Sequence, residues 1–379
     1  MIMFCAGTRP EIIKLAPLVA ECRAALGESS ALLVDTGQHA PEVLDPLLSF
    51  FGLSAEVRFN VRQGDDALAS LNARLLQALG DIIRERAPQA VIVQGDTASA
   101  LQGAMAAFLS GVPVGHVEAG LRSGNPWQPF PEEMNRSVIG RMSRWHFAPT
   151  LRAARALRAE VVPGEVHVTG NTIVDAVEVA RERMSGAAHS LLSESSRGMA
   201  QMLRAHRGLL VTMHRRENWR TGVVSVAEAV KARLAACPEL ACVWVLHPNP
   251  RVADRVREIL GSLPAGQAAR LRLVAPLPYP DMLYLMQACE LLLTDSGGIQ
   301  EEAVCLGLPT LVARDETERP EVIESGWGRL VGTHRDRVVA ALEEGGWRGE
   351  TLEGSNPLGD GSAAGRILDL IVQGLGRPS

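Results

Sequence analysis

The sequence has little of what marks several common classes of protein. Aromatic residues make up 4% of its 379 residues, and the formal net charge is −5 with a pI of about 6.0. A broad surface for nucleic acid or anionic lipid is therefore disfavoured, as is a platform of aromatic rings that stacks on bases. An anionic ligand would have to be held by a local group of positive charges.

Cysteine pairs, a secretion signal and long apolar runs are also missing. The six cysteines form no CxxC pair and no cluster with zinc spacing, so we interpret them as reduced core residues and expect no metal site. The first residues, MIMFCAGTRPE, lack a basic segment followed by a long apolar one, and no run of about 18 uncharged apolar residues follows. These absences predict a cytoplasmic protein without a membrane span.

Two nucleotide-binding signatures are absent as well. AGTRPE follows the first predicted strand in place of GxGxxG, and the phosphate loop GxxxxGK[ST] does not occur. We therefore expect no nicotinamide cofactor of the usual kind.

What the sequence does have is a regular alternation of short apolar runs and amphipathic segments. Strands are predicted at residues 2–7, 31–37, 90–96 and 113–119, and helices at 10–26, 68–87 and 99–111. The alternation starts again at residue 208, which predicts two doubly wound α/β units with parallel sheets. We expect the join within residues 170–208, where the polar stretch 185–198 looks least ordered, and a final apolar helix that packs back on either unit.

The stretch TDSGGIQEEA, residues 294–303, predicts an anion site. Ser296, Gly297 and Gly298 would expose backbone N–H groups at the start of a helix, where phosphate binds readily. Glu301 and Glu302 are predicted in the first helical turn, where a carboxylate can accept the hydroxyls of a ribose. The alternative is ordinary N-capping with acidic first-turn residues.

Other charged residues follow predicted strands of the first unit, at the sheet edge where ligands bind. Arg9 and Lys14 suit an anion, although two solvated surface charges would give the same pattern. Asp96 and Glu118 each follow a buried strand; for Asp96 a helix cap is the alternative.

Two further groups of charged residues complete the pattern. The segment PFPEEMNR places Glu132, Glu133 and Arg136 on what we predict to be a loop bounded by prolines. In the second unit, His214 and Arg215 end the first strand, and Arg319 follows a later one. Arginines beside His214 should lower its pKa and favour a neutral imidazole.

Together these residues suit a nucleotide sugar, because they offer cations for a diphosphate, an acid for a ribose, further carboxylates and a histidine. These residues also carry a resemblance: the chain resembles the non-hydrolysing UDP-N-acetylglucosamine 2-epimerases. The matching stretches are GTRPEIIKLAPLV, TGQH, VQGDT, PVGHVEAGLRS, PFPEEMNR, HFAPT, VTGNTIVDAV, HRREN, HPNP, LTDSGGIQEEA, TERPEV and NPLGDGSAAGRI.

The resemblance implies a GT-B-like α/β fold of two Rossmann-like domains with a cleft between them. The first domain would be residues 1–170 plus 360–379, with the C-terminal helix crossing back to it, and the second, UDP-binding domain would be residues 171–359. The resemblance further implies interconversion of UDP-GlcNAc and UDP-ManNAc in the cytoplasm for polysaccharide biosynthesis, with no cofactor, and a homodimer.

Site residues carry over by position. The resemblance assigns the substrate to Arg9, Lys14, Arg215 and Arg319, the diphosphate to Ser296, Gly297 and Gly298, and the ribose to Glu302. The catalytic set matches Asp96, Glu118, Glu132 and His214.

The chain departs from the family pattern at two places. Met282 stands where many members have a phenylalanine near the uracil. In bacterial members a second UDP-GlcNAc site activates the enzyme; Gln38, Arg215 and His247 match it, but Asp65 and Asp66 stand where an Arg-Gln pair is found. Acids there would repel a diphosphate, so we hypothesise that activation is weak or absent.

Inversion at C2 of the sugar needs a route without a ketone, since no nicotinamide site is expected. Loosening the bond from C1 to UDP would acidify the C2 proton, and loss of that proton would give a glycal. Re-addition of UDP, with protonation at C2 on the other face, would then give the epimer. Four alternatives remain open: a GT-B glycosyltransferase, a hydrolysing epimerase, an epimerase acting on a modified UDP-HexNAc, and a non-catalytic nucleotide-sugar sensor.

Overall fold

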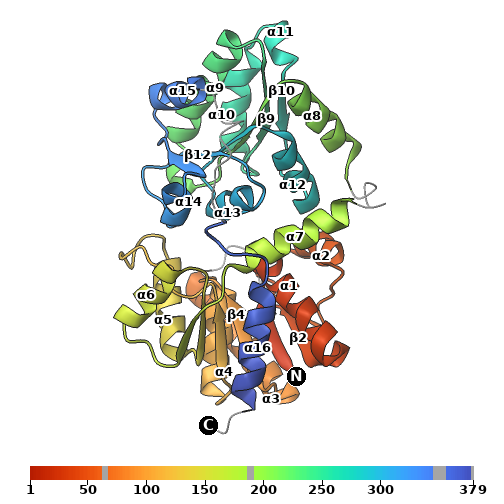
Figure 1. Cartoon of the computed structure of the whole chain (residues 1–379), viewed down its shortest axis with the longest axis vertical. Helices are drawn as coiled ribbons and strands as arrows, with labels where there is room; N and C mark the ends of the chain where they lie inside the picture. The colour runs from red at the N-terminus through yellow and green to blue at the C-terminus, as the bar shows by residue number, and fades with distance from the viewer. Residues whose placement is uncertain (62–66, 186–191, 345–355, 377–379) are drawn as a thin grey trace. The chain divides into compact units, whose positions relative to one another are not determined.

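The protein is an α/β chain with two parallel sheets, each lying between layers of helices (Figure 1). The computed structural model describes residues 1–61, 67–185, 192–344 and 356–376. In this part of the chain, no helix is both long and apolar enough to cross a membrane. The chain divides into two compact units, Met1–Ala180 together with Leu358–Ser379, and Arg181–Pro357.

The sheet of the first unit has the order β3-β2-β1-β4-β5-β6-β7, and all its pairs are parallel. Its strands are β1 (Ile2–Ala6), β2 (Ala31–Asp35), β3 (Val57–Arg58), β4 (Ala90–Gln94), β5 (Val114–Val117), β6 (Trp145–Ala148) and β7 (Glu165–Val168). Every residue of β1 and β4 is buried, because helices cover both faces of a parallel sheet and both sets of alternating side chains enter the core.

Eight α-helices and one 3-10 helix are described in the first unit, and the first of them begins and ends at residues suited to helix termini. They are α1 (Arg9–Leu26), α2 (Pro41–Phe51), α3 (Leu68–Arg86), α4 (Ala98–Leu109), α5 (Glu132–Met142), α6 (Leu151–Ala159), α7 (Thr172–Ser185) and α16 (Ala363–Leu375), with the short 3-10 helix η1 (Glu28–Ser30). Thr8 precedes α1 and Pro10 lies in its first turn, where the missing N–H costs nothing. Gly27 ends the helix at a φ of 93°, which favours glycine.

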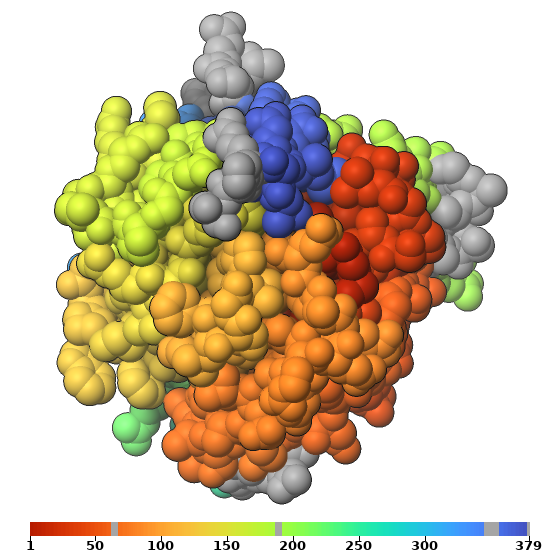
Figure 2. Space-filling model, turned by 90° about the horizontal axis from the view of Figure 1, so that it is seen from below, coloured from red at the N-terminus to blue at the C-terminus, as the bar shows by residue number. Residues whose placement is uncertain are grey.

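The C-terminal helix α16 belongs to the first unit. It lies beside the N-terminal segments on the face seen in Figure 2 and contacts α1. Its apolar face is buried, and Gly374 lets it approach β6 closely, since a Cβ there would come within 2.6 Å of the Trp145 ring. The apolar pattern alone leaves open which unit this helix joins, whereas the resemblance implies the first unit, where the structure places it.

The sheet of the second unit has the order β10-β9-β8-β11-β12-β13, again all parallel. Its strands are β8 (Arg207–Thr212), β9 (Leu240–Val245), β10 (Leu271–Val274), β11 (Leu291–Thr294), β12 (Thr310–Val312) and β13 (Gly328–Leu330). Its helices are α8 (Glu194–Ala205), η3 (Arg216–Asn218), α9 (Gly222–Ala236), α10 (Pro250–Gly261), α11 (Ala265–Ala268), α12 (Tyr279–Ala288), α13 (Gly297–Cys305), α14 (Pro320–Glu324) and α15 (Arg335–Glu343). The second core gathers around Leu209, Trp244 and Leu293.

Both sheets reverse their strand order at one point, between β1 and β4 in the first unit and between β8 and β11 in the second. At that point the loops that follow the two neighbouring strands run to opposite faces of the sheet, which leaves room for a ligand at the carboxyl ends of the strands. The loops after β1 and β4, and those after β8 and β11, are therefore where each unit should carry functional residues.

The join between the units lies within the expected range of residues 170–208. It comes ten residues after the boundary at residues 170 and 171 that the resemblance implies, because the buried first half of α7 packs with the first unit, which runs to Ala180. Asp175 of α7 accepts a hydrogen bond from the backbone N of Ala364 in α16 at 2.8 Å. Residues 186–191 of the stretch expected to be least ordered lie outside the described residues, and most of its remainder is helix α8, capped by Ser193.

Candidate active site

Lys14 and Glu118 form a buried ion pair at the carboxyl edge of the first sheet. Gln94, the last residue of β4, donates from Nε2 to the same Glu118 oxygen, Oε2, at 2.8 Å. Glu118 has a φ of 65°, which is rare outside glycine and frequent at functional sites. Helix α1 and strands β4 and β5 thus hold one carboxylate, and the alternative of a solvated surface charge is wrong for Lys14.

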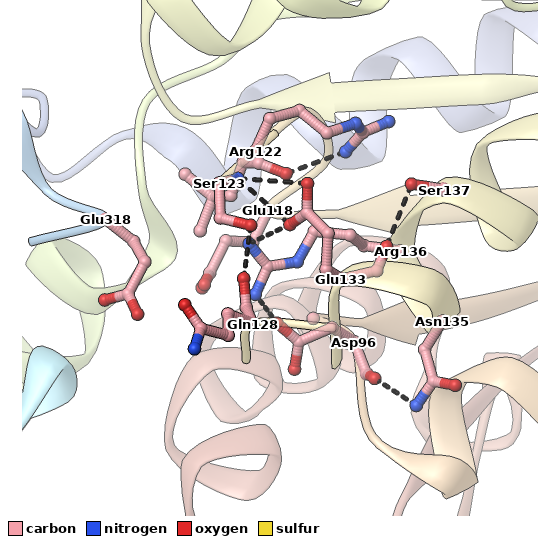
Figure 3. Close-up of polar contacts among 12 residues, drawn as sticks. Asp96, Glu118, Arg122, Ser123, Gln128, Glu133, Asn135, Arg136, Ser137 and Glu318 are labelled. Carbon is pink, nitrogen blue, oxygen red and sulfur yellow. Dashed lines mark hydrogen bonds and ion pairs between the residues drawn. The ribbon is translucent and has the colours of Figure 1, made fainter. Parts of the chain in front are cut away.

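Asp96 lies after β4 and is held by α5, as Figure 3 shows. Nη2 of Arg136 is 2.5 Å from Oδ2 of Asp96, and Nδ2 of Asn135 donates to the Asp96 backbone oxygen at 2.6 Å. Nη1 of Arg136 also lies 3.2 Å from Oε2 of Glu133. One buried guanidinium therefore lies between two carboxylates and fixes the side chain of Asp96.

The alternative role of Asp96 as a helix cap is also wrong. Thr97 caps α4, with its hydroxyl oxygen accepting a hydrogen bond from the backbone N of Ala100 at 3.0 Å. The carboxylate of Asp96 therefore does not cap the helix; it binds Arg136 and is available for catalysis.

The segment with Glu132, Glu133 and Arg136 was predicted as a loop, and this is wrong, because it forms the start of α5. Pro131 precedes the helix, and two carboxylates in the first turn suit the helix dipole. Glu133 is buried and accepts hydrogen bonds at 3.0–3.1 Å from the backbone N–H groups of residues 123 and 124, so it anchors the preceding loop (Figure 3). Glu132 is half-buried at the first helical position.

Arg9 opens α1 and is half-buried. Its backbone N donates to Nδ1 of His39 at 3.2 Å, which ties the start of α1 to the loop after β2. It is thus on the ligand edge of the sheet, one turn before Lys14.

In the second unit, the turn after β11 leads directly into α13. Ser296 is the N-cap residue, and Gly297 and Gly298 are the first two helical residues. The backbone N of Ser296 donates to Oγ1 of Thr294 at 3.1 Å. A Cβ on Gly298 would meet nothing within 4 Å, so the start of α13 is open on that side. The first N–H groups of the helix can therefore receive an anion.

The prediction that Glu301 and Glu302 lie in the first turn is wrong. Since α13 begins at Gly297, both fall in its second turn, and both are buried. Nε of Arg319, which follows β12, donates to Oε1 of Glu301 at 2.7 Å. The guanidinium lies so close to Gly297 that a Cβ there would be 2.7 Å from Nη1. The structure thus places Arg319 against the glycine turn.

A second carboxylate in this unit binds several arginines. Glu318 receives hydrogen bonds from Arg215 at 3.2 Å and from Arg314 at 2.7 Å, and Nη1 of Arg319 lies 3.6 Å away. Burial raises the pKa of Glu318, but the hydrogen bond from Arg314 and the charges of Arg215 and Arg319 outweigh it and hold that pKa well below its usual range. Three arginines thus share the carboxylates of Glu301 and Glu318.

His214 lies after β8, next to this cluster. Its backbone N and that of Arg215 donate to the two carboxylate oxygens of Asp295, at 2.8 and 3.1 Å. Asn218 donates to Asp295 as well, at 2.8 Å. The fully buried Asp295 therefore fixes the loop that carries His214 and Arg215 against the turn of Ser296.

The residues matching the activating site are only partly described. His247 lies 5.8 Å from His214 between ring centroids, and burial lowers its pKa despite the opposing charge of Asp295. Oε1 of Gln38, in the first unit, accepts from Oγ of Ser99 at 2.7 Å. Asp65 and Asp66, on which the activation hypothesis depends, lie outside the described residues.

Two further observations bear on ligands. Met282, one of the two departures from the family pattern expected from the sequence, is buried in α12. Among the described residues, no group of three or more His, Cys, Asp or Glu side chains is placed to hold a metal ion.

Three contacts escaped the sequence prediction. The sequence pattern places Gln94 only within a predicted strand, gives Arg136 no role and places Asp295 in a predicted turn. Gln94 and Asp295 are polar residues at or next to the end of a buried strand, which is a usable signal. Their partners are far away in the sequence, 24 residues for Gln94 and 81 for Asp295 with His214, so only the fold identifies them.

Comparisons with known proteins agree with this arrangement. The profile of the UDP-N-acetylglucosamine 2-epimerase family matches residues 24–372. The UDP-N-acetylglucosamine 2-epimerase of Salmonella typhimurium is 38% identical over 371 residues, covering 96% of each chain.

Solved structures are similar over the whole chain. The UDP-GlcNAc 2-epimerase of Neisseria meningitidis bound to UDP-GlcNAc superposes with a TM-score of 0.87 at 33% identity, over 98% of this chain and 99% of the other. S. aureus MnaA with UDP gives a TM-score of 0.86 at 36% identity, over 100% and 98%. The GT-B-like fold expected from the sequence is thereby confirmed, and the chain belongs to the UDP-N-acetylglucosamine 2-epimerase family.

Proposed function

We propose that the protein interconverts UDP-GlcNAc and UDP-ManNAc by eliminating UDP to a 2-acetamidoglucal and adding it back. Family membership supports the overall reaction. The observation that carries the proposed route is the open start of α13 with the guanidinium of Arg319 against Gly297, because this arrangement suits a diphosphate that gains negative charge as it leaves.

The chemistry accounts for the order of steps. The C2 proton of an acetamido sugar is not acidic, since no carbonyl lies at C1 or C3. When the C1–O bond breaks, its electron pair leaves with UDP and positive character grows at C1. A base then removes the C2 proton, and the electrons of that C–H bond form the C1–C2 double bond. In the return step, a proton is added at C2 on the other face and the diphosphate oxygen attacks C1.

The second unit stabilises the leaving group in this proposal. The backbone N–H groups of Gly297 and Gly298 and the hydroxyl of Ser296 receive the diphosphate, and Arg215 and Arg319 balance its charge. Glu302, one turn into α13, accepts the ribose hydroxyls. Because Asp295 fixes the backbone of Arg215 and Glu318 binds its guanidinium beforehand, little reorganisation is needed when the charge develops.

The carboxylates of the first unit handle the proton, with Arg9 and Lys14 as further cations for the substrate. Protonation on the opposite face requires at least two acid–base groups, and Asp96, Glu118 and Glu132 supply them. General acid–base catalysis of this kind contributes ~10²–10⁴-fold.

Incubation with UDP-GlcNAc in D₂O, followed by NMR of the sugar, tests the proposal. We expect UDP-ManNAc with deuterium at C2, because the removed proton exchanges with solvent. UDP-ManNAc that keeps only protium at C2 would refute the elimination. Free ManNAc with UDP would indicate a hydrolysing epimerase, and no ManNAc product at all would indicate a transferase or a sensor.

A further inference from the structure

Glu11 is a fully buried carboxylate that the proposed mechanism does not use. It is the third residue of α1, three positions after the N-cap residue Thr8, whose side chain accepts no capping hydrogen bond. Its Oε2 accepts hydrogen bonds from the backbone N of Gly7 at 3.0 Å and from Oγ1 of Thr8 at 2.7 Å. This oxygen therefore stabilises the turn between β1 and α1.

The second oxygen of Glu11 binds a different helix. Oγ1 of Thr97 donates to Oε1 of Glu11 at 2.5 Å, across 86 positions of sequence. The same Thr97 oxygen accepts from the backbone N of Ala100 and so caps α4. The turn between β1 and α1 accounts for the contacts of the first oxygen of Glu11 but not for this link. One carboxylate is thus shared by the starts of α1 and α4, the two helices on either side of the point where the strand order reverses.

These two helix starts carry residues of the candidate site. Arg9 lies two residues before Glu11, and Asp96 lies directly before Thr97. Asp96 is held from the α5 side by Asn135 and Arg136. The bond from Thr97 to Glu11 is the contact that ties the same segment to α1.

The protonation state of Glu11 matters for this link. All its partners donate, so they fit the ionised carboxylate, and a proton on either oxygen would displace a donor. Burial raises the pKa of Glu11 to about 7, against the hydrogen bonds from Thr97, Gly7 and Thr8. Cys5 of β1 faces Glu11 as a neutral thiol, because burial and the charge of Glu11 both raise the pKa of Cys5 far above neutrality.

We propose that Glu11 is a positioning residue, whose carboxylate joins the β1–α1 turn to the start of α4 and thereby holds Arg9 and Asp96 in place for the reaction. The proposal rests on the proposed function for its kinetic consequences, but the link itself does not. It follows that removing the polar group of either Glu11 or Thr97 should break the link and displace Asp96.

The test uses the full-length protein with the variants Glu11→Gln, Thr97→Val, Thr97→Ser and the double variant Glu11→Gln/Thr97→Val. Glu42→Gln is the matched control, since Glu42 is an exposed acid in the first turn of α2. We expect kcat for UDP-GlcNAc epimerisation to fall ~10–100-fold in Glu11→Gln and in Thr97→Val, with no further fall in the double variant, because both remove one link. Thr97→Ser, which keeps the hydroxyl, should retain most of the activity that Thr97→Val loses.

Two readouts separate positioning from mere stability. The kcat of the unmodified protein should fall as the pH drops through about 7, and Glu11→Gln should lack that step. Amide hydrogen exchange should also become faster in the Gly7–Thr8 and 97–101 segments of Glu11→Gln, but not in Glu42→Gln. The proposal is overturned if the exchange of residues 97–101 is unchanged, or if the effects on kcat of Glu11→Gln and Thr97→Val add up. If the unmodified protein forms no UDP-ManNAc, the proposed function fails, and hydrogen exchange still decides whether Glu11 forms the link.

Discussion

Replacing Gly297 by alanine should move Arg319 and weaken both the fold and the binding of UDP. An added Cβ would lie 2.7 Å from Nη1, 2.8 Å from Cζ and 3.0 Å from Nε of Arg319, so the guanidinium has to shift. That shift breaks the 2.7 Å hydrogen bond from Arg319 to the buried Glu301. A hydrogen bond to a charged group is worth ~1.5–3 kcal/mol, and alanine gains ~0.5–1 kcal/mol over glycine in a helix. We expect the free energy of unfolding to fall by ~1–2 kcal/mol.

Gly298 offers a matched control in the same helix. A Cβ at Gly298 would meet nothing within 4 Å, so Gly298→Ala should leave stability unchanged or slightly raised. Urea unfolding measures the stabilities. Titration calorimetry with UDP should show an affinity about tenfold lower for Gly297→Ala, which corresponds to ~1.4 kcal/mol for a displaced arginine.

A double-mutant cycle decides whether Arg319 is the cause. In an Arg319→Ala background the three nearest atoms are gone, so Gly297→Ala should no longer destabilise the protein. If Gly297→Ala costs the same with and without Arg319, the clash is not the cause and the reasoning is refuted.

Three other predictions concern the first unit and its regulation. Lys14→Met should lower the free energy of unfolding by ~3–5 kcal/mol in urea unfolding, because it removes the ammonium from a buried carboxylate. The double variant Lys14→Met/Glu118→Gln should recover part of this loss. If Lys14→Met is as stable as the unmodified protein, the buried ion pair is contradicted. Burial lowers the pKa of His116 to about 3, so on acidification the unfolded chain takes up a proton at His116 before the folded protein does. The free energy of unfolding should therefore fall by ~1.4 kcal/mol per pH unit as the pH drops from about 6.5 towards 3. His116→Gln should flatten that dependence in urea unfolding at several pH values, and an unchanged slope would rule out His116 as its source. With Asp65 and Asp66 in place of an Arg-Gln pair, UDP-GlcNAc should not activate the reverse reaction. The prediction is contradicted if the rate depends sigmoidally on the concentration of UDP-ManNAc and added UDP-GlcNAc removes the sigmoidal shape.

Sequence patterns sufficed for the regular parts of both units. Buried strands such as β1 and β4 appear as unbroken apolar runs because both their faces are covered, and α1 and α3 show helical spacing of apolar residues. The start of α5 was missed, since prolines and charged residues in PFPEEMNR resemble a loop. In the structure those carboxylates suit the first helical turn and anchor the preceding loop.

Local chemistry alone also identified the open helix start at Ser296, because glycine and serine before a helix leave N–H donors regardless of the rest of the fold. Local chemistry could not identify the partners of the charged residues. That Lys14 binds Glu118, that Arg136 holds Asp96 and that Arg319 lies against Gly297 depends on which strand ends meet at the edge of a sheet. Residue types and spacing determine where a strand or helix begins, whereas contacts between residues far apart in the chain arise only when strand order and packing bring them together.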